Sequence, residues 1–206
     1  MIYSPESLEM LKRRVRSSLT DKRFSHTIGV EMAAIHIGGF IMPTRIDELR
    51  AAALLHDIAK ELSRAEQVRL ARVYNASFSE DGVSDAVLHS FAAPGAVMEQ
   101  FSSFASPDVL DAICHHTLGK EDMSLFSEII FVSDFVEEGR EYEACRAALL
   151  YLLDALDQAS SAEEYEAALH RAAIMTIDST LSSLKRRGKE PMAETLLTKK
   201  ALEAKI

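Results

Sequence analysis

Apolar residues recur at spacings of three and four along most of this chain, and that period limits the fold more than any other feature. Near the start, Leu8, Leu11, Val15 and Leu19 follow it behind Ser4, a residue type that commonly caps a helix. No run of residues alternates apolar and polar side chains in the way that a half-buried strand requires. The pattern therefore predicts an all-α fold, with roughly eight or more helices joined by short connections.

Serine or threonine followed three residues later by an acidic residue is the capping-box signature, and it predicts where several helices begin. It occurs as Thr44 with Asp47, Ser63 with Glu66, and Ser161 with Glu164. One segment, IIFVSDFV, has the composition of a strand. It belongs to a longer run of Leu125, Ile129, Val132 and Val136, however, and the spacings of that run predict a helix.

The composition indicates one globular domain, with or without an appendage, and restricts its partners. Of the 206 residues, 48% are hydrophobic, which suffices to bury a core. The 32 acidic and 23 basic residues give a net charge of -9, so we expect the protein to repel nucleic acid and anionic membranes. No apolar run approaches the ~18 residues of a membrane span, and the charged N-terminus does not read as a signal peptide. Cys114 and Cys145 form no disulfide framework, so we expect a cytoplasmic protein.

The stretch AAALLHDIAKEL, residues 51–62, places an imidazole and a carboxylate side by side after an apolar run. A buried, uncompensated carboxylate at Asp57 would be strongly disfavoured, and a metal ion bound by His56 and Asp57 together would compensate it. Lys60 lies one helical turn further on, where its ammonium suits a phosphate. The alternative for Lys60 is an ordinary salt bridge to Asp57 or a neighbouring glutamate.

Two further residues lie in similar apolar settings, His26 in RFSHTIGV and Asp134 in IIFVSDFVEEGR. This order of His, His-Asp and Asp resembles the HD-domain superfamily of metal-dependent phosphohydrolases. Together with a histidine at 89 before a Gly-Ala pair and with AICHHTLG, the motifs resemble the YqeK family of hydrolases, which act on symmetrical bis(5′-nucleosyl) tetraphosphates such as diadenosine tetraphosphate. The resemblance extends into the tail, so it implies a single HD-domain helical bundle over residues 1–206, with 142–206 as a C-terminal helical extension.

The resemblance also implies a set of site residues. One metal ion is expected, iron above all, with manganese, cobalt or zinc as alternatives and a second ion not excluded. The implied metal ligands are His26, His56, Asp57 and Asp134. The implied contacts to substrate are Gly29, Lys60, His89, His116, Thr117 and Arg140, although helix packing explains Gly29 equally well. Catalytic roles are expected for Asp57, Lys60, His89 and His116.

The chain departs from the family pattern at three places. His115 stands where the family usually has tyrosine, so either His115 or His116 could face the site, and the register with Thr117 favours His116. The loop before Arg140 has an altered sequence. The spacing from His89 to the Gly-Ala pair is longer than usual, and an ordinary buried histidine remains an alternative there.

We therefore expect a cytoplasmic hydrolase that uses metal-activated water to cleave diadenosine tetraphosphate symmetrically into two ADP. Its partners would be such dinucleotides or ADP, without nucleic acid or membrane, and a homodimer is one option for its assembly. Two alternatives stay open: an HD enzyme that hydrolyses another nucleotide or uses two metals, and a non-catalytic nucleotide-binding protein. Retention of all four implied ligands argues against the second.

Overall fold

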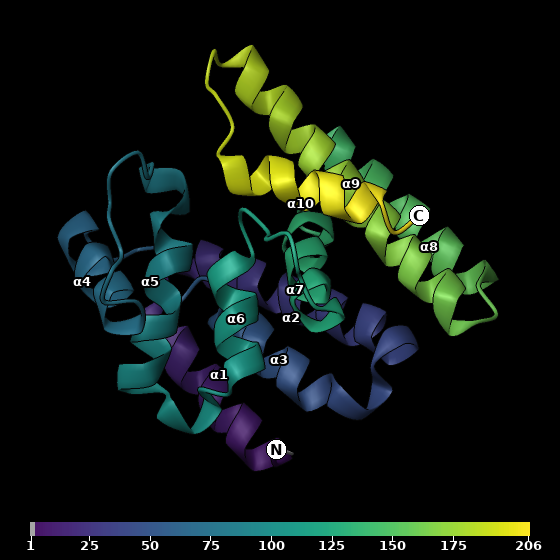
Figure 1. The fold of residues 1–206 in the computed structure, drawn as a ribbon. Coiled ribbons are helices and arrows are strands. Elements are labelled where there is room, and N and C mark those ends of the chain that lie inside the picture. Colours follow the sequence, from purple (N-terminus) through teal and green to yellow (C-terminus); the bar gives the residue numbers. More distant parts are fainter. Residues whose placement is uncertain (1–2) are drawn as a thin grey trace.

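A computed structural model describes residues 3–206 of the protein (Figure 1), and within that range every regular element is a helix. The helices are α1 (Pro5–Ser18), α2 (Asp21–Ile41), α3 (Ile46–Leu55), α4 (Arg64–Tyr74), α5 (Asp85–Gln100), α6 (Pro107–His115), α7 (Leu125–Val136), α8 (Glu143–Gln158), α9 (Ala162–Arg186) and α10 (Ala193–Glu203), with short 3₁₀ turns at Pro43–Arg45 and Ser102–Phe104. The predicted all-α fold is confirmed, including the helix over the strand-like segment IIFVSDFV.

Two of the three helix starts predicted from this signature are present, each with the serine as N-cap. In the Ser63–Glu66 and Ser161–Glu164 pairs the serine oxygen accepts a hydrogen bond from the backbone N–H of the glutamate. The prediction for Thr44 is wrong, because Thr44 lies inside the 3₁₀ turn that Pro43 begins, and α3 starts at Ile46 without a side-chain cap. An N-cap residue needs a non-helical backbone, and a preceding helical turn takes that away.

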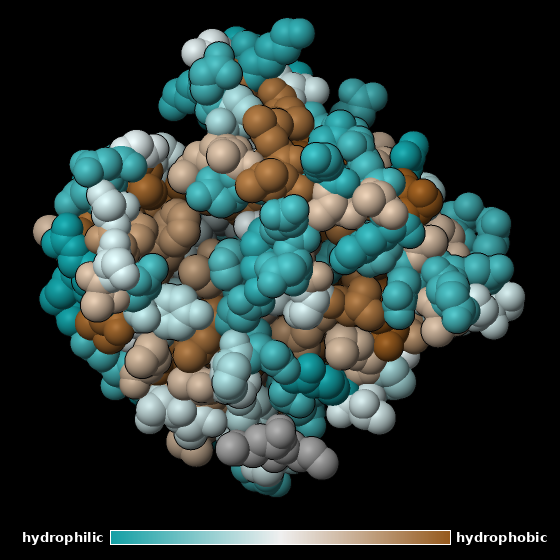
Figure 2. Space-filling view, in the orientation of Figure 1, coloured by the Kyte–Doolittle hydropathy of each residue, from teal (hydrophilic) through white to brown (hydrophobic). Residues whose placement is uncertain are grey.

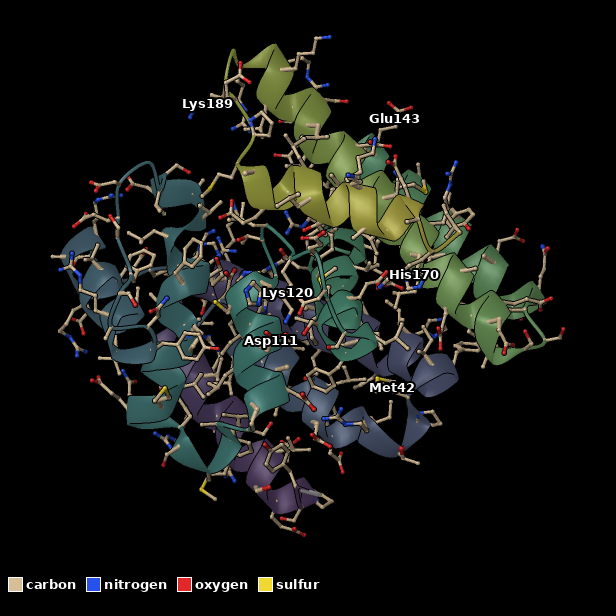
Figure 3. All side chains as sticks on the ribbon, viewed as in Figure 1. Met42, Asp111, Lys120, Glu143, His170 and Lys189 are labelled. Atoms are coloured by element: carbon tan, nitrogen blue, oxygen red, sulfur yellow. The ribbon has the colours of Figure 1, made fainter. Side chains whose placement is uncertain are left out.

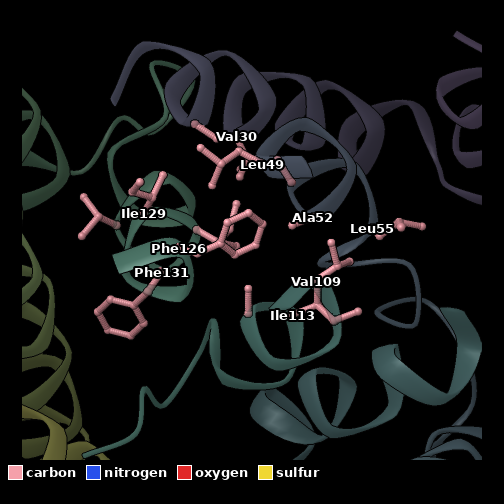
Figure 4. Close-up of a cluster of buried hydrophobic side chains, with 14 of the residues drawn as sticks. Val30, Leu49, Ala52, Leu55, Val109, Ile113, Phe126, Ile129 and Phe131 are labelled. Atoms are coloured by element: carbon pink, nitrogen blue, oxygen red, sulfur yellow. The ribbon is translucent and has the colours of Figure 1, made fainter. Parts of the chain in front are cut away.

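Helix α3 is the central element of the fold. Its last five residues, 51–55, are fully buried, and α1, α2, α6 and α7 pack around it. Figure 4 shows side chains of α2, α3, α6 and α7 meeting there, among them Ala52 and Phe126. Small alanines let the neighbouring helices approach closely. The helix ends at Leu55 and the chain continues through turns, so His56 and Asp57 lie just beyond the helix end, not within a longer helix as their apolar setting suggested.

The other helices lie on two sides of this centre. Helices α4 and α5 pair on one side, and α8, α9 and α10 form a group on the other, with α9 packed against α7 (Figure 1). The contact between α7 and α9 includes a buried polar pair, in which His170 Nδ1 lies 2.8 Å from Glu128 Oε1; His170 is marked in Figure 3. On the face seen in Figure 2, hydrophilic residues predominate between smaller hydrophobic groups. None of the helices described is both long and apolar enough to cross a membrane.

Candidate metal centre and active site

The structure brings the four implied metal ligands together from three separate parts of the chain. His26 comes from α2, His56 and Asp57 from the turn after α3, and Asp134 from α7. His26 Nε2 lies 3.0 Å from Asp134 Oδ1 and 3.8 Å from Asp57 Oδ2. His56 Nε2 lies 3.5 Å from Asp57 Oδ2 and 3.9 Å from Asp134 Oδ1. Two imidazole nitrogens and two carboxylates therefore converge on one small region of space.

Two nitrogens in this region fit a metal ion particularly well. His26 Nε2 and His56 Nε2 are buried and have no hydrogen-bond partner in the described part of the chain. The other ring nitrogen of His56, Nδ1, lies 2.7 Å from the carbonyl oxygen of Ala53, which fixes the ring with Nε2 pointing toward the carboxylates. Buried polar atoms without a partner are rare and costly. Neutral imidazole nitrogens beside carboxylate oxygens form a mixed donor set that suits a divalent transition metal.

A second group of side chains faces the other oxygen of Asp57. His89 Nε2 lies 3.1 Å from Asp57 Oδ1, and His116 Nε2 lies 3.7 Å from it, with 3.1 Å between the two Nε2 atoms. His116 is oriented by Ile113, whose carbonyl oxygen lies 2.7 Å from Nδ1. All three side chains are at most 3% exposed. Asp57 is thus shared between two groups of imidazoles.

The two adjacent histidines at the end of α6 point in different directions. His116 faces the site, while His115 turns toward Asp111, with its Nδ1 2.8 Å from the Asp111 carbonyl oxygen. The next residue, Thr117, lies at the edge of the site, where its hydroxyl is 2.9 Å from Ser90 Oγ. The geometry therefore agrees with the register argument from Thr117.

Cationic side chains flank the centre on both sides. Lys60 Nζ lies 3.1 Å from His89 Nδ1 and 3.2 Å from the Ala86 carbonyl oxygen, and no salt bridge to Asp57 is formed. Arg140 donates to both the carbonyl oxygen and the carboxylate of Asp134, at 2.8 and 2.7 Å. Both side chains are partly buried and lie next to residues of the centre. Such a pair of cations suits an anionic phosphate ligand.

Two residues of the site were not expected from the sequence. Arg23 donates to Asp57 Oδ2 at 2.7 Å, and Glu137 Oε1 lies 3.1 Å from His26 Nδ1. A carboxylate on the second nitrogen of a ligating histidine is a common supporting contact in metal sites. Gly29 explains why Glu137 fits, since a Cβ at that position would overlap the Glu137 carboxylate. Gly29 therefore lies behind His26 and against Glu137 in this structure.

The charges of the site reinforce one another. Burial alone would raise the pKa of Asp57, but the facing imidazoles lower it well below its usual range. Asp134 behaves likewise: burial opposes ionisation, yet the neighbouring His26 and Arg140 lower the pKa of its carboxyl. Burial lowers the pKa of His89 to about 4, so its imidazole is neutral at physiological pH. Burial opposes a charged imidazole at His56, but the neighbouring Asp57 and Asp134 raise its pKa. A metal requires deprotonated ligands, so binding at His56 would displace that proton.

Comparison with known proteins gives the class of this site. A family model described as the HD domain matches residues 23–159, about two thirds of the chain. The chain therefore belongs to the HD domain family, which indicates a metal-dependent phosphohydrolase. The matched range contains all four implied ligands and both flanking cations.

More narrowly, several relatives share one name, "bis(5′-nucleosyl)-tetraphosphatase, symmetrical". The protein from Halalkalibacterium halodurans is 33% identical over 128 residues, 62% of this chain and 67% of that protein. The one from Bacillus subtilis is 28% identical over 187 residues, 89% and 91% of the two chains. A crystal structure from Clostridium acetobutylicum, described as a predicted HD superfamily hydrolase involved in NAD metabolism, superposes with a TM-score of 0.79 at 25% identity over both whole chains. The resemblance to the YqeK family that the motifs indicated is confirmed.

Proposed function

We propose that the protein hydrolyses diadenosine tetraphosphate symmetrically into two molecules of ADP. The observation that carries this proposal is the convergence of His26, His56, Asp57 and Asp134, with Lys60 and Arg140 beside them. A tetraphosphate chain is densely anionic, so its hydrolysis depends on neutralising the phosphoryl oxygens and holding the reacting groups in line. The names of the relatives support this substrate and this position of cleavage.

We propose iron as the metal ion, with manganese, cobalt or zinc as alternatives, held by His26, His56, Asp57 and Asp134. When bound, such an ion polarises a phosphoryl oxygen and lowers the pKa of water toward neutrality. Four ligands of mixed nitrogen and oxygen type leave room for substrate. The donor set supports a transition metal but does not distinguish these ions.

The protein side chains have distinct roles in the proposal. Lys60, beside His89, and Arg140, beside Asp134, stabilise the phosphoryl oxygens. Burial lowers the pKa of Lys60, and a poorly solvated ammonium favours an anionic partner such as phosphate. His116 and the neutral His89 lie beside Asp57. We assign the donation of a proton to the departing ADP to His116, since a neutral imidazole at His89 can only accept one.

Gly29 and Thr117 complete the proposed substrate contacts. Gly29 acts indirectly through Glu137, because its missing Cβ makes room for that carboxylate. Thr117 supplies a hydroxyl at the edge of the centre.

We propose further that residues 1–206 work as a single HD domain with 142–206 as its extension. A cytoplasmic location fits the two free cysteines, the absence of nucleic-acid partners fits the net charge of -9, and a homodimer stays a prediction.

The proposal is tested by incubating metal-analysed protein with diadenosine tetraphosphate and resolving the products by anion-exchange chromatography. ADP as the sole product is the expected result. ATP with AMP would show asymmetric cleavage, and absence of turnover with iron, manganese and cobalt each supplied would contradict the proposal. The variant His36→Gln is a suitable control, because His36 lies on α2 away from the ligands and should retain full activity.

A two-metal enzyme is the second candidate, and one observation favours it. The two oxygens of Asp57 face different imidazole groups, His26 and His56 on one side and His89 and His116 on the other. A carboxylate between two sets of donors can bridge two ions. Metal analysis of freshly prepared protein distinguishes the two candidates. The one-metal enzyme holds one equivalent of metal and keeps it in the variant His89→Gln, whereas the two-metal enzyme holds two equivalents and loses metal in that variant.

A further inference from the structure

A cavity of about 600 Å³ adjoins the metal centre and extends away from it along α9. Its inner end is lined by His116, Asp134 and Arg140, which belong to the site already described. Its outer part is lined by the connection between α7 and α8 and by one face of α9. The volume lies within the range of about 300–1,000 Å³ that small-molecule sites occupy. The centre is therefore one end of a longer recess.

The face of α9 that lines this cavity carries polar side chains at successive turns. They are Thr176, Ser179, Thr180, Ser183, Arg186 and Arg187. The spacing of three and four keeps them on one side of the helix, over about 15 Å at ~1.5 Å per residue. Among the described residues, the hydroxyls of Ser179 and Ser183 have no hydrogen-bond partner, whereas Thr180 donates to a backbone carbonyl. A polar strip of this length is suited to an extended polar ligand.

Two arginines occupy the outer end of the strip. Neither Arg186 nor Arg187 lies within salt-bridge distance of a carboxylate in the described part of the chain; the Nε of Arg187 donates to the Ser183 carbonyl oxygen. With Arg140 they place three cations against two lining carboxylates, Asp134 and Glu143. The whole protein carries a net charge of -9, so this recess is a locally cationic exception. Glu143 is marked in Figure 3 at the start of α8, and Lys189 in the turn beyond α9.

An exposed aromatic ring lies at the rim of the same cavity. Tyr142, two residues after Arg140, is 73% exposed, the largest value among the exposed large hydrophobic residues. Exposed aromatic rings without an intramolecular partner commonly stack with nucleobases, and arginine guanidinium planes do the same. Aromatic ring, hydroxyls and cations thus line one recess that begins at the proposed reaction centre.

We propose that this recess binds one adenosine diphosphate half of the substrate, with the diphosphate beside Arg140 and the adenine stacked on Tyr142. Ser179 and Ser183 face the ribose, and Arg186 and Arg187 close the outer end. The inference rests on the proposed function, because it assumes that the scissile phosphate lies at the metal centre. It assigns the C-terminal helices a direct part in selecting a dinucleotide over a simple phosphate ester.

The test compares the binding of ADP and of inorganic pyrophosphate to the metal-loaded protein by calorimetry. In Tyr142→Ala, ADP affinity should fall about tenfold, the size expected for one base-stacking contact, while pyrophosphate affinity stays within twofold. Tyr142→Phe should restore ADP binding because the ring is kept. In the double variant Arg186→Ala/Arg187→Ala, ADP affinity should fall at least tenfold.

The double variant Lys185→Ala/Lys189→Ala is the matched control. It removes the same charge from the same end of α9, but neither lysine lines the recess, so ADP affinity should change by less than twofold. Equal losses in both double variants would show general electrostatic attraction and overturn the proposal, as would unchanged ADP affinity in Tyr142→Ala. Hydrolysis is assayed in parallel. Wild-type protein that binds ADP through these residues but does not cleave the dinucleotide would refute the proposed function alone. A normal KM for the dinucleotide in all variants would refute only the proposal that the recess binds the ADP half of the substrate.

Discussion

Glu31 and Asp57 are both buried carboxylates, 2% and 3% exposed, yet their surroundings differ in kind. Each oxygen of Glu31 has its own permanent cation, Lys12 Nζ at 2.9 Å and Arg50 Nε at 3.0 Å, and these contacts join α1, α2 and α3. Asp57 has one permanent cation, Arg23, and is otherwise surrounded by imidazoles. A carboxylate whose partners are all permanent cations already has its charge compensated and serves as a structural contact. A carboxylate surrounded mainly by imidazole nitrogens can still bind a metal ion.

The largest difference should appear in the variant Asp57→Asn. The amide keeps the shape of the side chain and its contact to Arg23, but it removes a ligand charge, so metal content should drop and kcat should fall by about 10³-fold or more. Metal analysis and turnover measure the loss. The far-ultraviolet circular dichroism should keep its helical form, because residues 51–55 still anchor α3 in the core.

Activity near the wild-type level in Asp57→Asn would exclude Asp57 as a ligand. A collapsed helical signal would instead place Asp57 with Glu31 among the structural contacts. Either result removes the distinction between the two carboxylates.

The variant Glu31→Gln tests the other side of the comparison. It leaves Lys12 and Arg50 partly buried without their carboxylate, so the free energy of unfolding should fall by about 3 kcal/mol. Urea unfolding measures this change. The folded fraction should keep its metal and its kcat, because Glu31 does not touch the centre. Glu66→Gln is the control: both Glu66 and its partner Arg69 are exposed, so the free energy of unfolding should stay close to that of the wild type.

How far the sequence predicted this arrangement depends on the range of each interaction. Helical spacing is local, so it predicted the all-α fold, although Thr44 failed as a cap because Pro43 had already begun a helical turn. The apolar setting of His56 and Asp57 suggested a metal ion there, but the full set with His26 and Asp134 was expected only from the resemblance to a known family. The sequence did not predict Arg23 and Glu137 as site residues, because their partners lie 34 and 111 residues away along the chain.

A local signal for those two residues did exist. Arg23 precedes His26 by three residues, and Glu137 follows Asp134 by three, one helical turn from a ligand in each case. Charged residues at that spacing are too common to be chosen without the fold. The cationic recess along α9 could not be predicted from the sequence either, since its lining residues come together only when α9 packs against α7.

A smaller effect is expected from Glu137→Gln, which separates direct ligands from their supports. Glu137 Oε1 lies 3.1 Å from His26 Nδ1, and its other oxygen accepts a hydrogen bond from the Gly139 N–H at 2.7 Å. The glutamine retains an acceptor for Gly139 but loses the charge that orients and polarises the imidazole. Metal affinity should therefore fall by about 10–100-fold, with folding stability nearly unchanged. Competition with a chelator measures the affinity, and a change below threefold would show that Glu137 only packs against Gly29.

The smallest effect concerns Asp111, a carboxylate between the two extremes. Burial alone would raise the pKa of Asp111, but hydrogen bonds from His115, Lys120 and Ser127 lower it below the ordinary value of 3.8; Asp111 and Lys120 are marked side by side in Figure 3. Because the carboxyl is more acidic in the folded than in the unfolded protein, its contribution to stability is present above pH 3.8 and is lost as the pH falls below that value.

The variant Asp111→Asn should accordingly lose about 1 kcal/mol at pH 7, since its side chain is only partly buried and its ion pair to Lys120 is screened by solvent. The difference from the wild type should shrink as the pH is lowered from 4 toward 2, because protonation removes the same interaction from the wild type. Urea unfolding across this range measures the change. If the difference in free energy of unfolding between the wild type and Asp111→Asn stayed constant with pH, Asp111 would contribute by packing and neutral hydrogen bonds. Glu31 and Asp111 would then differ more in the charge of their partners than in their burial.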